Sequence, residues 1–173
     1  RDELAHCAGG EGADEYHLLG ILADIDEAAG ASQFGAEFAD VDVTLAIRLR
    51  QASADAGALF IVNDRCDLAL AVEADGVHLG QGDLPLAHAR SLMGREKLIG
   101  VSTHRLEQVE EATRGGADYL GYGPIFDTAT KPDHEPVVGL EGLRQVRPRT
   151  GLPIIAIGGL SLENSRQAIE EIG

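Results

Sequence analysis

The chain is poor in several residue types, and each shortage excludes a class of protein. Its 173 residues include no tryptophan and one methionine, and aromatic residues make up only 4%. The two cysteines, Cys7 and Cys66, are too few and too far apart for a disulfide framework or a zinc site. These shortages argue against a small secreted scaffold and favour a reducing compartment.

Positive charge and long apolar runs are also scarce. The 14 Lys and Arg residues face 29 Asp and Glu residues, a formal net charge of −15, which argues against sequence-independent binding to nucleic acid. No run of about 18 apolar residues occurs, and the acidic first residues lack the basic and apolar regions of a signal peptide. We therefore expect a cytoplasmic protein without membrane or nucleic-acid partners.

Short apolar runs alternate with longer segments of helical period from Leu18 onward, as in repeated βα units around a parallel sheet. We expect one domain over residues 16–173, after a loosely ordered segment over residues 1–15. The predicted strands are 17–23, 32–38, 58–62, 76–80, 97–102, 118–123 and 153–159, and predicted helices include 43–57, 84–94, 105–116 and 140–146.

This pattern suits either a TIM barrel or a doubly wound sheet. No GxGxxG motif follows the first predicted strand, and the strand-to-helix spacing stays regular, so an α/β fold of the TIM (β/α)8 type is favoured. With about seven strands the barrel is expected to be incomplete, the eighth strand missing at the C-terminus. An unclosed sheet leaves two strand edges exposed, which favours loose order near the N-terminus or a homo-oligomer.

Polar side chains follow the apolar runs, and active sites of such barrels lie at these carboxyl ends of the strands. Asn63 and Asp64 follow one run, and Gln81 and Asp83 follow the next. Because Mg²⁺ prefers oxygen ligands, typically one or two carboxylates with water and substrate phosphate, Asp64 and Asp83 predict a shared magnesium site. Either aspartate alone is equally consistent with an N-cap of the following helix.

Histidines and a long loop leave further alternatives open. His78 lies inside an apolar run, as either a satisfied core histidine or a ligand contact. His104, at a helix start, favours a surface role over a general base. The Gly- and Pro-rich segment 123–143 suits either a mobile loop over a ligand or a solvated turn.

The pair Gly158 and Gly159 directly follows a predicted buried strand. Glycines at this position let the backbone approach a phosphate closely, and barrels often bind phosphate after their last strands. A plain tight turn is the alternative.

Three segments, IVNDRCDLALAVEADGVHLGQGDLP, LIGVSTHRLEQVEEATRGGADYLGYGPIFDTATK and PIIAIGGLS, closely resemble the thiamine phosphate synthase family. The resemblance is dense over residues 58–159. It implies a TIM barrel that joins hydroxymethylpyrimidine diphosphate to thiazole phosphate with Mg²⁺, forming thiamine phosphate and pyrophosphate. These small phosphorylated substrates are the partners it implies.

The resemblance also implies residue roles. The metal ligands would be Asp64 and Asp83, and the catalytic residues Lys131, Ser102 and Asn63. The substrate-binding residues would be Gln33, Asn63, His78, Ser102, Thr128, Thr130, Lys131, Gly158 and Gly159.

The chain departs from the family pattern within the second predicted strand. The family has a Q-L-R-x-K pattern there, whereas Gly35 and Glu37 stand at the two cationic positions of this sequence. In another register, Arg48 or Arg50 would supply the charge. Two other functions stay open: a thiazole tautomerase-like isomerase, which typically lacks both carboxylates, and a non-catalytic barrel that binds a phosphorylated ligand.

Overall fold

A computed structural model of the chain describes residues 20–23, 38–127 and 135–172. Within them six strands form one sheet, in the order β1-β2-β3-β4-β5-β6, and every neighbouring pair is parallel. The elements are β1 (Gly20–Ala23), α2 (Phe38–Asp55), β2 (Leu59–Asn63), α3 (Cys66–Ala71), β3 (Gly76–Leu79), α4 (Leu86–Met93), β4 (Leu98–Thr103), α5 (Leu106–Gly115), β5 (Tyr119–Tyr122), α6 (Gly139–Val146), the 3-10 turn η1 (Arg147–Arg149), β6 (Ile154–Ala156) and α7 (Ser165–Ile172).

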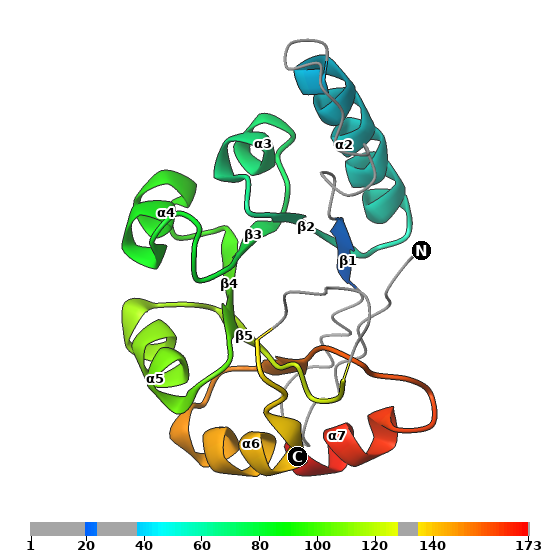
Figure 1. Cartoon of the computed structure of the whole chain (residues 1–173). Helices are drawn as coiled ribbons and strands as arrows, with labels where there is room; N and C mark the ends of the chain where they lie inside the picture. Colours follow the sequence, from blue (N-terminus) through cyan, green and yellow to red (C-terminus); the bar gives the residue numbers. More distant parts are fainter. Residues whose placement is uncertain (1–19, 24–37, 128–134, 173) are drawn as a thin grey trace.

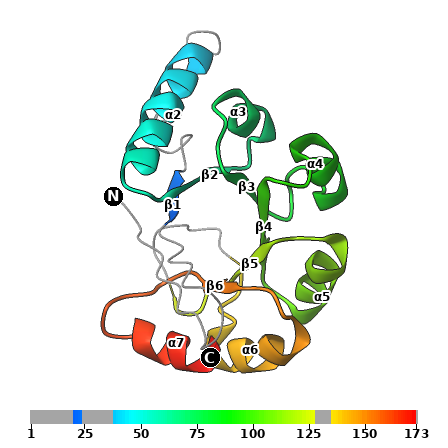
Figure 2. The same ribbon diagram turned by 180° about the vertical axis from the view of Figure 1, so that it is seen from behind.

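The sheet is curved, and the helices cover its outer side. The strands follow one another along an arc in Figure 1, and the helices form a ring outside them. The view from behind in Figure 2 shows the same arrangement. An α/β fold of consecutive parallel strands that curl inside a layer of helices is part of a TIM-like barrel.

The structure confirms most of the predicted strands and corrects part of the prediction. Six of the seven overlap observed strands. The remaining one, 32–38, lies outside the described residues except for Phe38, which begins helix α2, so the prediction is wrong at that residue. Helices α3 and α7 lie in segments for which no helix was predicted. Residues 1–15 lie outside the described ranges.

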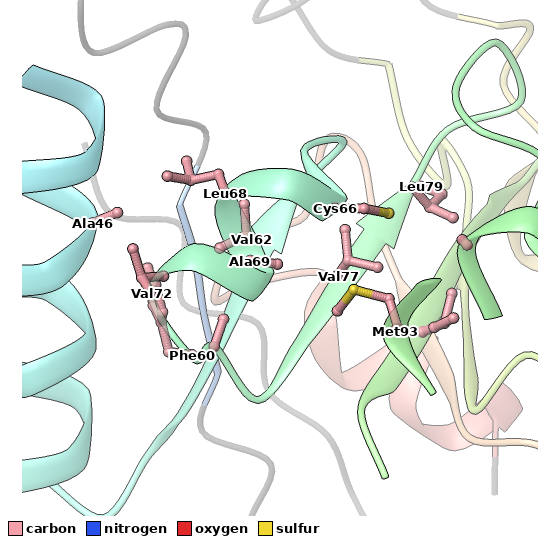
Figure 3. Close-up of a cluster of buried hydrophobic side chains, with 13 residues drawn as sticks. Ala46, Phe60, Val62, Cys66, Leu68, Ala69, Val72, Val77, Leu79 and Met93 are labelled. Atoms are coloured by element: carbon pink, nitrogen blue, oxygen red, sulfur yellow. The ribbon is translucent and has the colours of Figure 1, made fainter. Parts of the chain in front are cut away.

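Side chains alternate between the two faces of each strand. This alternation determines which residues face the helices and which face the inside of the curved sheet. Outward residues such as Phe60, Val62 and Val77 are buried against helices α2, α3 and α4, and Figure 3 shows this cluster. A second cluster packs β4, β5 and β6 against α5, α6 and α7. Because the period of a strand is two, the residues between these positions face the inside of the curve.

Two aspartates fasten neighbouring strands at the amino edge of the sheet by the same device. Asp75, just before β3, accepts a hydrogen bond from Phe60 N–H at 2.7 Å and donates its own N–H to the Phe60 carbonyl at 2.9 Å. Asp118, just before β5, does the same with Ile99 of β4, at 2.7 and 2.8 Å.

A guanidinium from the outer helices completes each of these connections. Arg50 of α2 pairs with Asp75, and Arg90 of α4 pairs with Asp118. Hydrogen bonds to charged groups are stronger than neutral ones. Asp75 and Asp118 therefore anchor helices as well as strands.

No helix in the described part of the chain is long and apolar enough to span a membrane.

The connection at Asp118 predicts a specific loss of stability. Asp118→Ala leaves the Ile99 N–H and the Arg90 guanidinium without their carboxylate, and we expect it to lower the free energy of unfolding by about 2 kcal/mol. Arg114→Ala is the control, because it removes only a 4.0 Å pair with Glu110 in which the Arg114 side chain is 74% exposed, and we expect a loss below about 0.5 kcal/mol. Urea denaturation measures both, and equal losses would contradict this account of the amino edge.

Candidate active site

The sheet carries three of the predicted site residues side by side on neighbouring strands. Asn63 ends β2, His78 lies in β3, and Ser102 lies in β4. In the sheet register Asn63 pairs with His78, His78 with Gly100, and Ser102 with Gly121. Four other predicted site residues lie outside the described residues: Gln33, Thr128, Thr130 and Lys131.

Asp64 occupies an unusual backbone conformation directly after β2. Its φ is +58°, and the Arg65 N–H donates back to the Asn63 carbonyl at 2.6 Å across it. The Asp64 N–H donates to the His78 carbonyl at 2.8 Å, which ties the ends of β2 and β3 together. A non-glycine residue with positive φ costs about 1 kcal/mol or more, so this turn holds the aspartate at the edge at some cost in stability.

Asp83 closes the loop that follows β3. Its carboxylate accepts a hydrogen bond from the Gly80 N–H at 2.6 Å. Burial raises the pKa of Cys66 and lowers the pKa of His78, and the negative charge of Asp83 makes a smaller upward contribution to both values. The charge of Asp83 therefore acts on His78 in β3 and on Cys66 at the start of α3. Cys66 is two residues after Asp64 in the chain.

The helix starts decide between the two interpretations of these aspartates. The N-cap of α3 is Arg65 and the N-cap of α4 is Pro85, and neither makes a side-chain capping hydrogen bond. Asp64 and Asp83 are thus not the N-cap residues of the helices that follow them. The alternative of two independent helix caps is wrong.

The two carboxylates suit a magnesium ion by their chemistry. Mg²⁺ needs hard oxygen ligands and usually keeps several waters, so one or two protein carboxylates are enough when substrate phosphate supplies the rest. Within the described residues no group of three or more His, Cys, Asp and Glu side chains is placed to hold a metal ion. The donor set therefore fits an ion shared with a phosphorylated ligand better than a closed protein cage.

His78 is a buried histidine with both ring nitrogens engaged. It is 7% exposed, with Nε2 at 2.8 Å from Ser102 Oγ and Nδ1 at 3.1 Å from the Tyr119 hydroxyl. Burial lowers its pKa to about 4, against a smaller opposing effect of Asp83. The ring is therefore a neutral group that holds Ser102 in place.

Tyr119 was not among the predicted site residues. Its ring lies across β4 at Gly100, where a Cβ atom would come within 2.1 Å of Tyr119 Cζ. A sequence signal for this arrangement exists, since Gly100 and Gly121 occupy strand interiors, where glycine often marks a close approach of another group. Ser102 is also held through its backbone, because Gln81 Nε2 donates to the Ser102 carbonyl at 2.6 Å.

His104 follows the end of β4, two residues after Ser102, so the strand period places it on the same face as Ser102. Its Nδ1 lies 2.5 Å from the Gly123 carbonyl oxygen, and because a carbonyl only accepts, Nδ1 carries the hydrogen. The ring is half-buried, so the predicted surface role describes it only in part. Its described contact fastens the end of β4 to the start of the segment after β5.

Gly35 and Glu37, where the family has cations, lie outside the described residues. Two arginines of the described part, Arg50 and Arg65, pair with other carboxylates. Arg50 points to the opposite edge, where its guanidinium pairs with Asp75 and donates to the Glu73 carbonyl. Arg65 makes a bidentate pair with Asp67, and this bond is the main reason why the pKa of Asp67 falls to about 2. The suggestion that Arg50 compensates is therefore wrong, and Arg48, the other candidate, is an exposed residue of helix α2.

The Gly158–Gly159 turn after β6 has a backbone that requires glycine. Both glycines have positive φ, +84° and +65°. A Cβ on Gly158 would lie 2.4 Å from Pro124 Cβ, and one on Gly159 would lie 2.5 Å from the Asp127 carbonyl oxygen. Within the described residues, no acceptor takes the N–H of either glycine. Successive free N–H groups in such a turn can receive an anion.

A curved parallel sheet inside a layer of helices, with carboxylates, a held serine and a glycine turn at its carboxyl edge, defines an α/β protein of the TIM-like barrel type, of which the described residues form part. The comparisons with known proteins agree. The model of the family described as thiamine monophosphate synthase matches residues 39–172, and the chain belongs to this family.

Individual relatives give the extent of the similarity. The thiamine-phosphate synthase of Chloroflexus aurantiacus is 55% identical over 120 residues, which cover 69% of this chain and 55% of that protein. That of Halalkalibacterium halodurans is 52% identical over 110 residues, covering 64% and 52%. The solved thiamine phosphate pyrophosphorylase of Pyrococcus furiosus superposes with a TM-score of 0.68 at 41% identity, covering 75% of this chain and 61% of that one. The chain thus spans little more than half the length of these curated relatives.

The close approach at Gly158 predicts a stability loss beyond the cost of its φ. Gly116 is the matched control, because its φ of +85° is the same and, within the described part of the chain, no atom lies within 4 Å of an added Cβ. We expect Gly116→Ala to cost about 1 kcal/mol, and Gly158→Ala to cost about 1 to 3 kcal/mol more because of the contact with Pro124. Urea denaturation measures both variants, and equal losses would show that the turn does not pack against Pro124.

Proposed function

We propose that the protein is a thiamine phosphate synthase, a transferase. It condenses hydroxymethylpyrimidine diphosphate with thiazole phosphate in a Mg²⁺-dependent reaction that yields thiamine phosphate and pyrophosphate. The bond from the pyrimidine methylene carbon to the diphosphate oxygen breaks, and a bond from that carbon to the thiazole nitrogen forms. The observation that carries the proposal is the placement of Asp64 and Asp83 after neighbouring strands, in a family of this name, where neither is the N-cap residue of the following helix.

In this proposal Asp64 and Asp83 hold the magnesium ion. When bound, the ion offsets the negative charge that develops on the leaving diphosphate. The strained turn at Asp64 supports this role, because a backbone outlier kept at a site is expected to serve function. The Asp83 carboxylate is fixed by the Gly80 N–H, so it needs no reorientation before it binds an ion.

The other described residues take the substrate. Asn63 and Ser102 bind the pyrimidine diphosphate, and His78 lies beside its ring. Asn63 is half-buried at the end of β2 and is paired in register with His78. The N–H groups of Gly158 and Gly159 take the phosphate of the thiazole substrate, which suits their positive φ values and their lack of other described acceptors.

Four residues enter the proposal through the family resemblance alone. Lys131 would bind the departing diphosphate as a point charge, Thr128 and Thr130 would bind the thiazole phosphate, and Gln33 would bind the pyrimidine substrate. Lys131 carries particular weight, because Gly35 and Glu37 supply no positive charge at the positions where the family has Arg and Lys.

The two alternative functions are less well supported. A tautomerase-like relative would not need the two carboxylates that this chain retains. A non-catalytic barrel would account for Gly35 and Glu37, and it remains an outcome of the assay below. An incomplete barrel of about seven strands without the eighth, a single domain over 16–173, a homo-oligomer and the cytoplasm stay predictions.

The magnesium role of Asp64 is tested with two matched glycine variants. Asp64 and Glu73 have the same backbone strain, with φ values of +58° and +54°, so glycine relieves the same strain at both positions. In the intact protein we expect both variants to fold. Only Asp64→Gly should lower the Mg²⁺-dependent formation of thiamine phosphate, by about 100-fold or more, because it removes a carboxylate from the ion.

Equal activity of Asp64→Gly and Glu73→Gly would remove Asp64 from the magnesium site. If the parent protein forms no thiamine phosphate from both substrates and Mg²⁺ but still binds thiazole phosphate, the non-catalytic barrel replaces the synthase.

A further inference from the structure

Three hydroxyl- and imidazole-bearing side chains form a continuous chain of hydrogen bonds across β3, β4 and β5. Tyr119 contacts His78 Nδ1 at 3.1 Å, and His78 Nε2 contacts Ser102 Oγ at 2.8 Å. Tyr119 is 4% exposed and His78 7% exposed. The chain therefore runs from the buried interior to Ser102, which is only half-buried at the carboxyl edge.

Glycines fix the positions of both rings. Gly100 leaves the space that the Tyr119 ring occupies, and a Cβ on Gly121 would lie 3.1 Å from His78 Cε1. The two ring centroids are 5.4 Å apart, with an angle of 34° between the planes. The positions of both rings are thus fixed, whereas the direction of each hydrogen bond is not.

That direction has two alternatives, because a neutral imidazole has one donor and one acceptor nitrogen. In the first, the Tyr119 hydroxyl donates to Nδ1, and Nε2–H donates to Ser102 Oγ. The Ser102 hydroxyl hydrogen is then available to a ligand. In the second, Nδ1–H donates to the Tyr119 oxygen and the Ser102 hydroxyl donates to Nε2, so that Ser102 can only accept from a ligand.

The acidity of the donors favours the first alternative. A phenol, with a pKa near 10, gives up its hydrogen more readily than an aliphatic hydroxyl, so it is the better partner for an imidazole lone pair. Burial keeps the ring neutral, because it lowers the pKa of His78 more than the negative charge of Asp83 raises it. A diphosphate and a pyrimidine ring offer mainly acceptor atoms, which need a donor from the protein.

We propose that Tyr119 is a positioning residue that acts through His78 to make Ser102 Oγ a hydrogen-bond donor to the pyrimidine diphosphate. The ligand part rests on the proposed function, whereas the direction of the hydrogen bonds is a property of the free protein. Tyr119 touches no substrate in this arrangement. Its hydroxyl determines which nitrogen of His78 carries the hydrogen.

The first test reads the tautomer of His78 in the free, intact protein, by correlating its ring nitrogens with its ring carbon-bound hydrogens in ¹⁵N NMR. We expect the Nε2–H tautomer. Tyr119→Phe removes only the hydroxyl, and we expect the tautomer to shift toward Nδ1–H. Tyr122→Phe is the matched control, since Tyr122 is also buried on β5 but belongs to the outer core cluster, and it should leave His78 unchanged.

The second test is a double-mutant cycle on the affinity for hydroxymethylpyrimidine diphosphate with Mg²⁺, measured by calorimetry. We expect Tyr119→Phe to weaken binding about 3- to 10-fold and Ser102→Ala about 10-fold. The double variant should bind no more weakly than Ser102→Ala alone, because both changes remove the same hydrogen bond.

Two results would overturn the proposal: an Nδ1–H tautomer in the parent protein, or additive losses in the cycle. Absence of diphosphate binding by the parent would overturn the proposed function instead. The tautomer measurement would still decide the direction of the hydrogen bonds.

Discussion

The register of the parallel strands is the constraint on which the rest of this structure depends. Because successive side chains alternate, one register sends Phe60, Val62 and Val77 out to the helices and turns Asn63, His78 and Ser102 toward the inside of the curve. A slip by one residue in any strand would exchange these two sets. The apolar core thus fixes the polar interior: burying the outer faces also determines which residues meet inside.

The amino and carboxyl edges of the sheet differ in how they affect stability. At the amino edge, Asp75 and Asp118 join strands and helices through short, charged hydrogen bonds. At the carboxyl edge, Asp64 lies in a positive-φ turn, and Gly158 and Gly159 keep N–H groups for which the described residues provide no acceptor. This division suits a barrel in which one edge supplies stability and the other binds ligands at some cost in stability.

Much of this arrangement could be predicted from the sequence, because strong apolar runs ended by Gly and Asp mark the strands. The runs before Asn63 and around His78 correctly placed β2 and β3 to within a residue or two. Helix α3 was missed because its six residues are too few to display a helical period. Whether Asp64 and Asp83 cap helices could not be decided either, since the answer depends on where α3 and α4 begin.

The contact of Tyr119 with His78 could not be predicted from the sequence. This contact requires that Gly100 of the neighbouring strand leave room for the Tyr119 ring, and a glycine inside a strand marks a close approach without showing which residue makes it. The cationic positions at Gly35 and Glu37 raise the opposite difficulty. The sequence shows what is absent there, and Arg50, the candidate replacement, is engaged at the far edge with Asp75.

The central claim is that the aspartates of two neighbouring strand ends share one metal ion with a diphosphate. The most direct measurement replaces Mg²⁺ with paramagnetic Mn²⁺ in the intact protein with inorganic pyrophosphate, and follows the broadening of backbone amide signals by NMR. The account predicts that the amides of Asp64 and Asp83 broaden together at the lowest Mn²⁺ concentration, while those of Asp75 and Asp118 at the opposite edge stay sharp. Broadening of one aspartate without the other, or equal broadening at both edges, would contradict it.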